Sequence, residues 1–342
     1  MNTLAICTDY EDSINDYNTA VNFLRIKDDV YPKLLAEWQC ISKEIDNYLV
    51  ATKLEYLQRN FPETKFIKQY YSNEAWRVTE AIEKLLQRMK NFFQRTIQYI
   101  KVFVVVRLGA AAQVIKRWAE TCDKNSNKVE EYIKGIDKKD MSVTSLTELM
   151  FVATSLYTEF QDMFTKITNM TVSAAASGDN ANSLVEEPSR YQDWLKRLEQ
   201  VEKENPRNKE TNGSAAKTLF EGQWADAVDL QRLAKAVEQS RVVTTDLNKL
   251  DITAKKLISE LSTSDNTPPA QKTDNDNGKA EVQAEDVLKK RKLEFLKKFS
   301  DVFMKKLISS FVRYASHAGD QCSQFTKGFD KTNKKLTADA TS

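Results

Sequence analysis

The chain has 342 residues, of which only 8 are glycine and 6 are proline. Because glycine and proline mark the turns of sheets, this composition disfavours a many-stranded fold, and the abundance of helix-forming residues predicts an all-α protein. The 51 lysines and arginines nearly balance the 49 acids, which excludes a strongly basic protein overall. The charges are unevenly spread, however: basic residues gather near residues 76–118 and 287–313, and the first fifty residues are acid-rich.

Cysteine and histidine give no pattern of a metal site. The four cysteines, Cys7, Cys40, Cys122 and Cys322, are scattered without a C-x-x-C pair, and His317 is the only histidine. A zinc site needs clustered ligands at short spacing, so we expect no structural metal, no cofactor, and thiols that are buried or incidental in a reducing compartment. The acid-rich N-terminus is untypical of a signal peptide.

The first predicted elements are two amphipathic helices within residues 12–60, where apolar residues recur every three or four positions. Pro32 fits the first turn of the second helix, where its missing N–H costs no hydrogen bond. Pro62 fits the end of that helix.

The next element, from Trp76 to Trp118, is the most informative part of the chain. Its apolar and aromatic residues recur at helical spacing, and the charges between them are almost all positive. We predict one long basic amphipathic helix, with Gly109 as the position for a bend. Lys101 and Arg107 interrupt its valine-rich centre, whereas a membrane span needs about 20 apolar residues, so no membrane-spanning helix is predicted.

The following residues complete a predicted N-terminal helical bundle over residues 1–172. A short helix reaches Ile136, and a helix over residues 143–171 carries so few charges that we expect it inside the bundle. Residues 173–214 are predicted to be linkers that flank a short helix around Trp194.

Residues 215–261 are predicted to form a long helix. Leu247, Leu250, Ala254, Leu257 and Leu261 alternate spacings of three and four, as the seam of a coiled coil does. Packing against a neighbouring helix of the same chain is the alternative to self-association.

The last part of the chain, residues 262–342, divides into two predicted segments. Residues 262–283 are very polar and should be a disordered linker. Residues 284–342 should form a second basic amphipathic helix, to about residue 316, and a polar tail that frays after Gly319. This helix either packs back on the bundle or acts separately.

No sequence signature of an enzyme is present. Phosphate-binding loops, dinucleotide-binding turns, hydrolase elbows and zincin helices all lack their motifs. A nucleophile would need a base within reach, and His317 lies near the C-terminus in a region that we expect to be weakly ordered. We therefore predict a protein that is not an enzyme.

Nucleic acid and other anionic surfaces are one predicted class of partner, because lysine and arginine neutralise phosphates and aromatic rings such as Trp76 and Tyr99 stack on bases. The alternative is that the aromatic residues form the core and the charges only solvate helix faces. The predicted contact residues are the cations of the two basic helices: Arg88, Arg95, Lys101, Arg107, Lys116, Arg117, Lys289, Lys290, Lys297, Lys298, Lys305 and Lys306.

A membrane surface is the second class of partner, with Phe92, Phe93, Phe103, Phe299 and Phe303 as the inserting face. A helix with cations on one face and aromatic residues on the other can equally be the inner wall of a bundle. An anionic membrane therefore stays open as a partner.

Three segments of the first 135 residues resemble the internal head proteins of large tailed bacteriophages: Asp9–Tyr17, Ala81–Phe93 and the continuation through Lys116–Trp118. This resemblance implies a non-enzymatic virion structural protein in the capsid interior, made in the host cytoplasm. The implied partners are other virion proteins and genomic DNA, without a small-molecule substrate. Some such proteins are trimmed after a glutamate in an apolar-x-Glu context, which Glu186 and Glu260 match.

Overall fold

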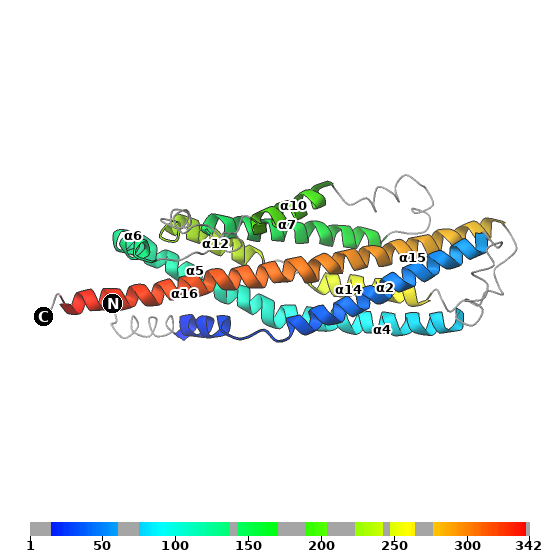
Figure 1. The fold of residues 1–342 in the computed structure, drawn as a ribbon, viewed down its shortest axis with the longest axis horizontal. Helices are drawn as coiled ribbons and strands as arrows, with labels where there is room; N and C mark the ends of the chain where they lie inside the picture. Colours follow the sequence, from blue (N-terminus) through cyan, green and yellow to red (C-terminus); the bar gives the residue numbers. More distant parts are fainter. Residues whose placement is uncertain are drawn as a thin grey trace, which may run out of the picture.

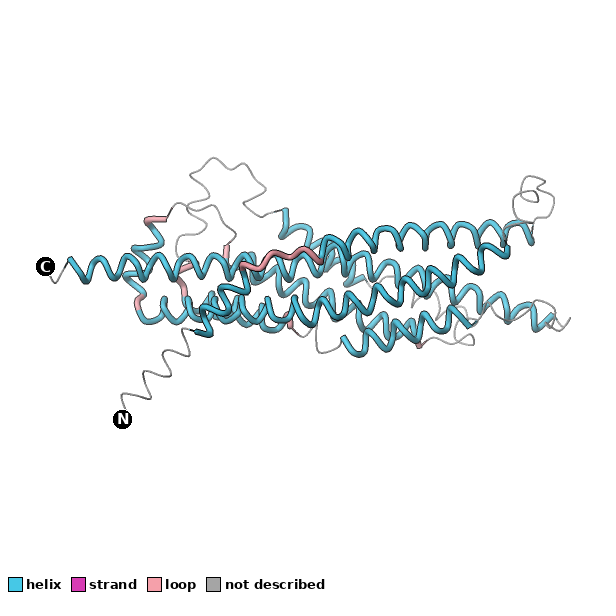
Figure 2. The backbone as a smooth tube through the Cα atoms, turned by 90° about the horizontal axis from the view of Figure 1, so that it is seen from below, coloured by secondary structure: helices cyan, strands magenta, loops and turns pink. Residues whose placement is uncertain are grey.

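The computed structural model describes residues 15–60, 75–136, 142–169, 189–203, 223–241, 247–263 and 276–339. Figure 1 shows long helices that run along one axis of an extended bundle, and Figure 2 shows the same arrangement from below. Within these ranges every regular element is a helix. The prediction of an all-α protein is therefore confirmed.

The N-terminal part consists of a helix over residues 15–24 and of α2 (Tyr31–Asn60). Asp28 caps α2, because its Oδ1 accepts hydrogen bonds from the amides of Val30 at 3.1 Å and Tyr31 at 3.0 Å. Pro32 lies in the first turn, as predicted. Pro62 lies outside the described residues.

The predicted central helix is continuous, and it contains one π turn. It consists of α4 (Ala75–Tyr99), the π-helical turn η1 (Ile100–Val104) and α5 (Val105–Lys124). The irregularity predicted at Gly109 is therefore found at η1 instead, and the helix passes through Gly109 without interruption. A Cβ atom on Gly109 would come no closer than 3.8 Å to another residue, so no close approach requires this glycine.

The C-terminal helix is longer than predicted. It begins with α15 (Asp276–Val302), passes through a second π turn, η4 (Phe303–Leu307), and ends with α16 (Ile308–Asp339). The predicted fraying after Gly319 is wrong, because Cys322, Phe325 and Phe329 continue the buried stripe. The predicted linker 262–283 is helical at 262–263 and 276–283, and its remaining residues lie outside the described ranges.

The central helix and the C-terminal helix lie side by side and run in the same direction. The Nε of Arg107 donates to the Oγ of Ser316 at 2.8 Å, and the rings of Trp118 and Phe325 lie 5.6 Å apart. The residue numbers therefore rise in the same direction along both helices. α16 thus packs along α5 and forms part of the bundle.

Further helices surround this pair: α6 (Ser126–Lys134), α7 (Val143–Thr168), α10 (Ser189–Lys203), α12 (Ala227–Gln239) and α14 (Leu247–Thr263). α7 contacts α10, α12, α14, α15 and α16 through a buried face, but Phe151 on its other side is 52% exposed, so α7 is buried on one face and not on all sides as predicted. α14 packs against α4 and α7, and Ala254 and Leu257 of the predicted seam are buried; the side chains of Leu247, Leu250 and Leu261 lie outside the described residues.

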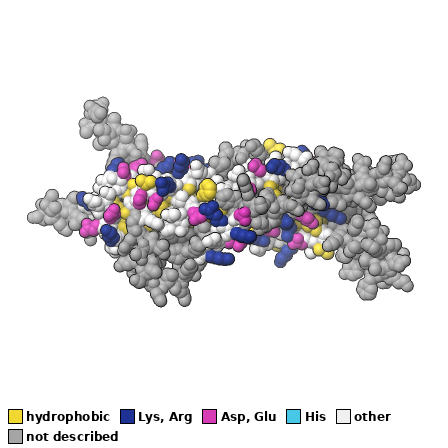
Figure 3. All heavy atoms as spheres, turned by 90° about the horizontal axis from the view of Figure 1, so that it is seen from above, with side chains coloured by type: hydrophobic (Ala, Val, Ile, Leu, Met, Phe, Trp, Pro, Cys, Tyr) yellow, Lys and Arg dark blue, Asp and Glu magenta, His cyan; other side chains and the backbone are white. Residues whose placement is uncertain are grey.

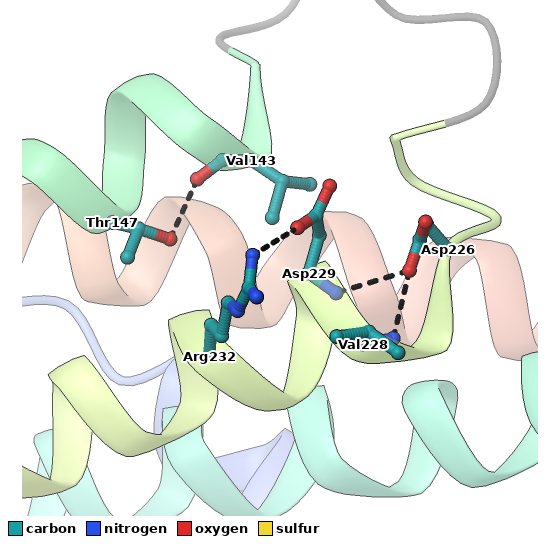
Figure 4. A network of polar contacts seen from close by, with 6 residues as sticks. All are labelled: Val143, Thr147, Asp226, Val228, Asp229 and Arg232. Carbon is teal, nitrogen blue, oxygen red and sulfur yellow. Dashed lines mark hydrogen bonds and ion pairs between the residues drawn. The ribbon is translucent and has the colours of Figure 1, made fainter.

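The predicted long helix over residues 215–261 is divided into two. α12 begins after Asp226, whose Oδ1 accepts from the amides of Val228 at 2.8 Å and Asp229 at 3.1 Å (Figure 4). It ends at Ser240, a buried residue whose hydroxyl donates back to the carbonyl of Val237 at 2.6 Å. The hydroxyl thereby satisfies a carbonyl of the last turn.

One hydrophobic cluster extends through the described helices from Tyr17 to Phe329. Its largest fully buried side chains include Trp38 and Trp118. The indole N–H of Trp38 donates to Asp301 at 2.9 Å, and that of Trp118 donates to the carbonyl of Trp224 at 2.7 Å. The tryptophans therefore fix contacts between helices that are far apart in sequence.

Candidate interaction surface

Two arginines of α4 form ion pairs with acids of α2. Arg88 pairs with Glu44 and Arg95 with Glu37. As the residue numbers rise along α4, those of the partners fall along α2, so the two helices are antiparallel. The acid-rich beginning of the chain is thus the local partner of the basic helix, and the arginine side chains are still 45% and 56% exposed.

Arg107 is half-buried and bound to other elements of the fold. Besides its bond to Ser316, its Nη1 donates to the carbonyl of Ile26 at 2.7 Å and its Nη2 donates to the carbonyl of Leu24. Its guanidinium also lies 5.1 Å from the centre of the Phe103 ring. The structure therefore places Arg107 as a cap for the end of helix 15–24, and a phosphate could reach it only by displacing these contacts.

The neighbouring cations of the central helix have different surroundings. Lys101 is exposed on η1. Lys116 pairs with Glu238 of α12 at 2.7 Å and is 48% exposed. Arg117 is half-buried, with its guanidinium 4.2 Å from the centre of the Tyr17 ring. Arg117 thus packs helix 15–24 onto α5.

The lysines of the C-terminal helix also meet acids. Lys297 lies 3.0 Å from Asp46 of α2 and 3.8 Å from Asp301, and Lys305 lies 3.0 Å from Asp301. Lys306 lies 3.7 Å from Glu199 of α10. The remaining predicted residues are Lys290, which is half-buried, Lys298, which is exposed, and Lys289, whose side chain lies outside the described residues.

The predicted residues therefore do not converge on one site. They lie along two parallel helices, and six of them, Arg88, Arg95, Lys116, Lys297, Lys305 and Lys306, contact acids of α2, α10, α12 and α15. Where Figure 3 shows described atoms, dark blue cations and magenta acids alternate over the surface. Such a surface can exchange intramolecular ion pairs for contacts with an external polyanion.

The aromatic residues of the basic helices are in the core. Phe92, Phe93, Phe299 and Phe303 are at most 6% exposed, and Phe103 is half-buried. This confirms the interpretation that helical spacing of these aromatic residues marks a core. The side chain of Trp76, which together with Tyr99 was predicted to stack on bases, lies outside the described residues.

One described helix, Glu83–Lys124, has the length and composition of a membrane span, with a mean hydropathy of 1.4 in its most apolar window. The sequence prediction differed because it counted only uninterrupted apolar residues and stopped at Lys101 and Arg107. In the structure 56% of that window is buried by other helices. The helix thus combines the composition of a membrane span with the burial of a core helix.

Sequence reasoning missed the buried cation Lys292. Its ammonium group donates to Glu260 of α14 at 2.7 Å and to the carbonyl of Thr168 at 3.1 Å, so it links α15 to two other helices. A signal was present, because Lys292 lies midway between Leu288 and Leu296 on the apolar stripe. The surrounding lysines and arginine masked this position.

The buried thiols are poorly suited to nucleophilic chemistry. Burial raises the pKa of Cys122 to about 12, and burial also raises the pKa of Cys322 well above its ordinary value. Cys40 is exposed on α2. Among the described residues, no three histidine, cysteine or acidic side chains come together in a way that could hold a metal ion.

No protein-family model matches the chain, and searches of curated proteins and of solved structures give no significant match either.

Proposed function

We propose that this chain is a non-enzymatic structural protein of a phage virion, held inside the head, whose basic helices contact DNA or the inner surface of the capsid. In this proposal an elongated bundle presents its central basic helix, and the C-terminal helix, which packs along α5, presents the second set of lysines. Two observations support the proposal: the resemblance of the first 135 residues to internal head proteins, and the exposure of cations on the central helix.

The observation that carries the proposal is the contrast between the two faces of the central helix. Arg88, Arg95 and Lys116 stay 45–56% exposed within their ion pairs, whereas the aromatic residues of the same helix are buried. An exposed ion pair contributes only about 0–1 kcal/mol, so a phosphate or a capsid carboxylate can replace the internal acid at small cost. This favours electrostatic contact over insertion of the aromatic face.

The first test is a triple variant, Arg88→Gln, Arg95→Gln and Lys116→Gln, in a DNA-shift assay at two salt concentrations. A plot of log affinity against log salt concentration has a negative slope. For each phosphate that the variant no longer neutralises, this slope should become less steep by about 0.9. The control removes equal charge elsewhere, at Lys27, Lys128 and Arg232, which are exposed on other elements. Equal slopes for both variants would refute a DNA contact at these three residues.

The location is tested separately. Mass spectrometry of purified virions is expected to find this chain, together with any product trimmed after Glu186 or Glu260. Its absence from purified particles would refute the virion role, whatever the DNA assay gives.

A membrane-associated protein is the second candidate, because helix Glu83–Lys124 has the composition of a span. Insertion would require the bundle to open, since Phe92 and Phe299 are almost fully buried. Co-sedimentation with anionic vesicles that survives high salt would favour this candidate, because counterion-driven binding weakens as salt rises.

A further inference from the structure

Both long helices contain a π turn, and the two turns lie at nearby levels of the bundle. η1 (Ile100–Val104) ends three residues before Arg107, and η4 (Phe303–Leu307) ends nine residues before Ser316, the partner of Arg107. The axial offset is therefore about 9 Å at 1.5 Å per residue. π turns are rare in proteins and often mark functional positions.

Residues at the start of α2 contact η4 and the residue just before η1. The hydroxyl of Tyr31 donates to the carbonyl of Met304, within η4, at 2.5 Å. The hydroxyl of Tyr99, the residue just before η1, donates to the Oδ2 of Asp28. The other carboxylate oxygen of Asp28 caps α2 at Val30 and Tyr31. One short segment, residues 25–31, thus links η1, η4 and the start of α2, and we name it the clasp.

Aromatic stacking continues this connection. The ring of Tyr99 lies 6.4 Å from that of Tyr31 and 5.4 Å from that of Phe103, with interplanar angles of 22° and 17°. Phe23, on helix 15–24, contacts Phe103 in turn at 6.0 Å. Burial, with a contribution from the Asp28 charge, raises the pKa of Tyr31 to about 12, so its hydroxyl remains a donor at physiological pH.

Apart from the half-buried Tyr31 ring, the clasp buries little apolar surface. Ile26 is 48% exposed and Val30 is 52% exposed, and Lys27 and Asp29 form an ion pair that is largely in solvent. Segments with few buried contacts open locally at much lower free energy than the core. The clasp therefore rests on a few hydrogen bonds and the aromatic stack, and its release needs no unfolding of the bundle.

We propose that the clasp is a latch that couples the two π turns, and that its release lets both turns rearrange together. A π turn closes i→i+5 hydrogen bonds instead of the i→i+4 bonds of the α pattern, so an exchange of backbone hydrogen bonds would shift it. Because α5 and α16 pack in parallel and share the Arg107–Ser316 bond, movement at η1 is transmitted to η4. Release of the clasp would allow α5 and α16 to rotate together relative to α4 and α15.

The test is amide hydrogen exchange, followed by mass spectrometry, in the full-length chain. Tyr31→Phe removes only the donor to Met304 and keeps the ring, whereas Asp28→Ala removes the acceptor of Tyr99 and the cap of α2. In each variant the amide hydrogens of both π turns are expected to exchange about five-fold faster. A factor of this size corresponds to the loss of one hydrogen bond. Asp29→Ala, on the exposed neighbouring carboxylate, should leave both turns unchanged.

The decisive readout is the response of the turn that a variant does not touch. The hydroxyl that Tyr31→Phe removes bonds η4 alone, and the ring that stacks on Tyr99 is kept, so faster exchange at η1 in this variant supports coupling. Faster exchange confined to η4, no change in either turn, or an equal increase throughout α7 and α12 would each overturn the proposal.

Discussion

Replacement of glycine by alanine should change the free energy of unfolding in opposite directions at two positions in the paired helices α5 and α16. A Cβ atom on Gly319 of α16 would lie 2.9 Å from Cδ1 of Leu24, 3.1 Å from Cα of Ala111 and 3.3 Å from Cβ of Ala111. The leucine end can turn away, but the backbone of Ala111 cannot. On Gly109 of α5 the nearest atoms belong to the Arg241 guanidinium at 3.8 Å, an ordinary contact distance.

The expected magnitudes follow from two opposing effects. Alanine in place of glycine inside a helix stabilises by about 1 kcal/mol, and overpacking of a tight contact costs about 1–3 kcal/mol. Gly109→Ala should therefore raise the free energy of unfolding by about 1 kcal/mol. Gly319→Ala should lower it by up to about 2 kcal/mol, because only this variant pushes α5 and α16 apart.

Urea unfolding followed by far-UV circular dichroism measures both effects, provided that the slope of free energy against urea stays unchanged. Gly319→Val should be less stable than Gly319→Ala, since it adds two further methyl groups at the crossing. Equal stabilisation by Gly319→Ala and Gly109→Ala would refute the close parallel packing of α5 and α16.

Three further predictions concern ionisable groups. Burial raises the pKa of Asp320 above its unfolded value, so the fold favours the protonated acid and loses stability as pH rises through the folded pKa; Asp320→Asn should raise the urea midpoint at neutral pH more than in acid. Lys292→Met should change the urea midpoint little, whereas Glu260→Gln should lower it clearly by leaving a buried ammonium group without its countercharge. In the folded chain a thiol reagent at mildly alkaline pH should modify Cys40 and spare Cys122 until denaturant is added; rapid labelling of Cys122 would contradict its burial.

The helical class and much of the outline were predictable because they depend on local properties. Scarce glycine and proline disfavoured a many-stranded fold, and the spacing of apolar residues located α2, the central helix and α7. The break after α12 also had a local signal that the leucine seam concealed: β-branched residues, which are poor helix formers, follow Ser240 and Arg241.

The error at the C-terminus came from interpreting Gly319 as a helix end. Glycine does often end helices, but here its missing side chain permits the crossing with Ala111. The spacing of Ala318, Cys322, Phe325 and Phe329 by four, three and four residues continued the helical stripe beyond it. Glycine alone did not distinguish a helix end from a helix crossing.

Helix partners were not predictable from spacing. An amphipathic stripe shows which face is buried and does not identify what buries it, so the contact between Trp118 and Phe325 had no sequence signal. The same holds for charges. A run of basic residues resembles a docking surface until Glu37 and Glu44 are found opposite Arg95 and Arg88.

This pairing makes polyanion binding and the packing of α2 competing processes. A phosphate chain that takes over Arg88 and Arg95 would leave Glu37 and Glu44 beside it as uncompensated like charges. Repulsion would then loosen α2 from α4, although Trp38 would still hold α2 through Asp301 and the core. The proposed DNA contact therefore requires faster hydrogen exchange in α2 when DNA binds, and unchanged or slower exchange there would show that the arginines keep their internal partners.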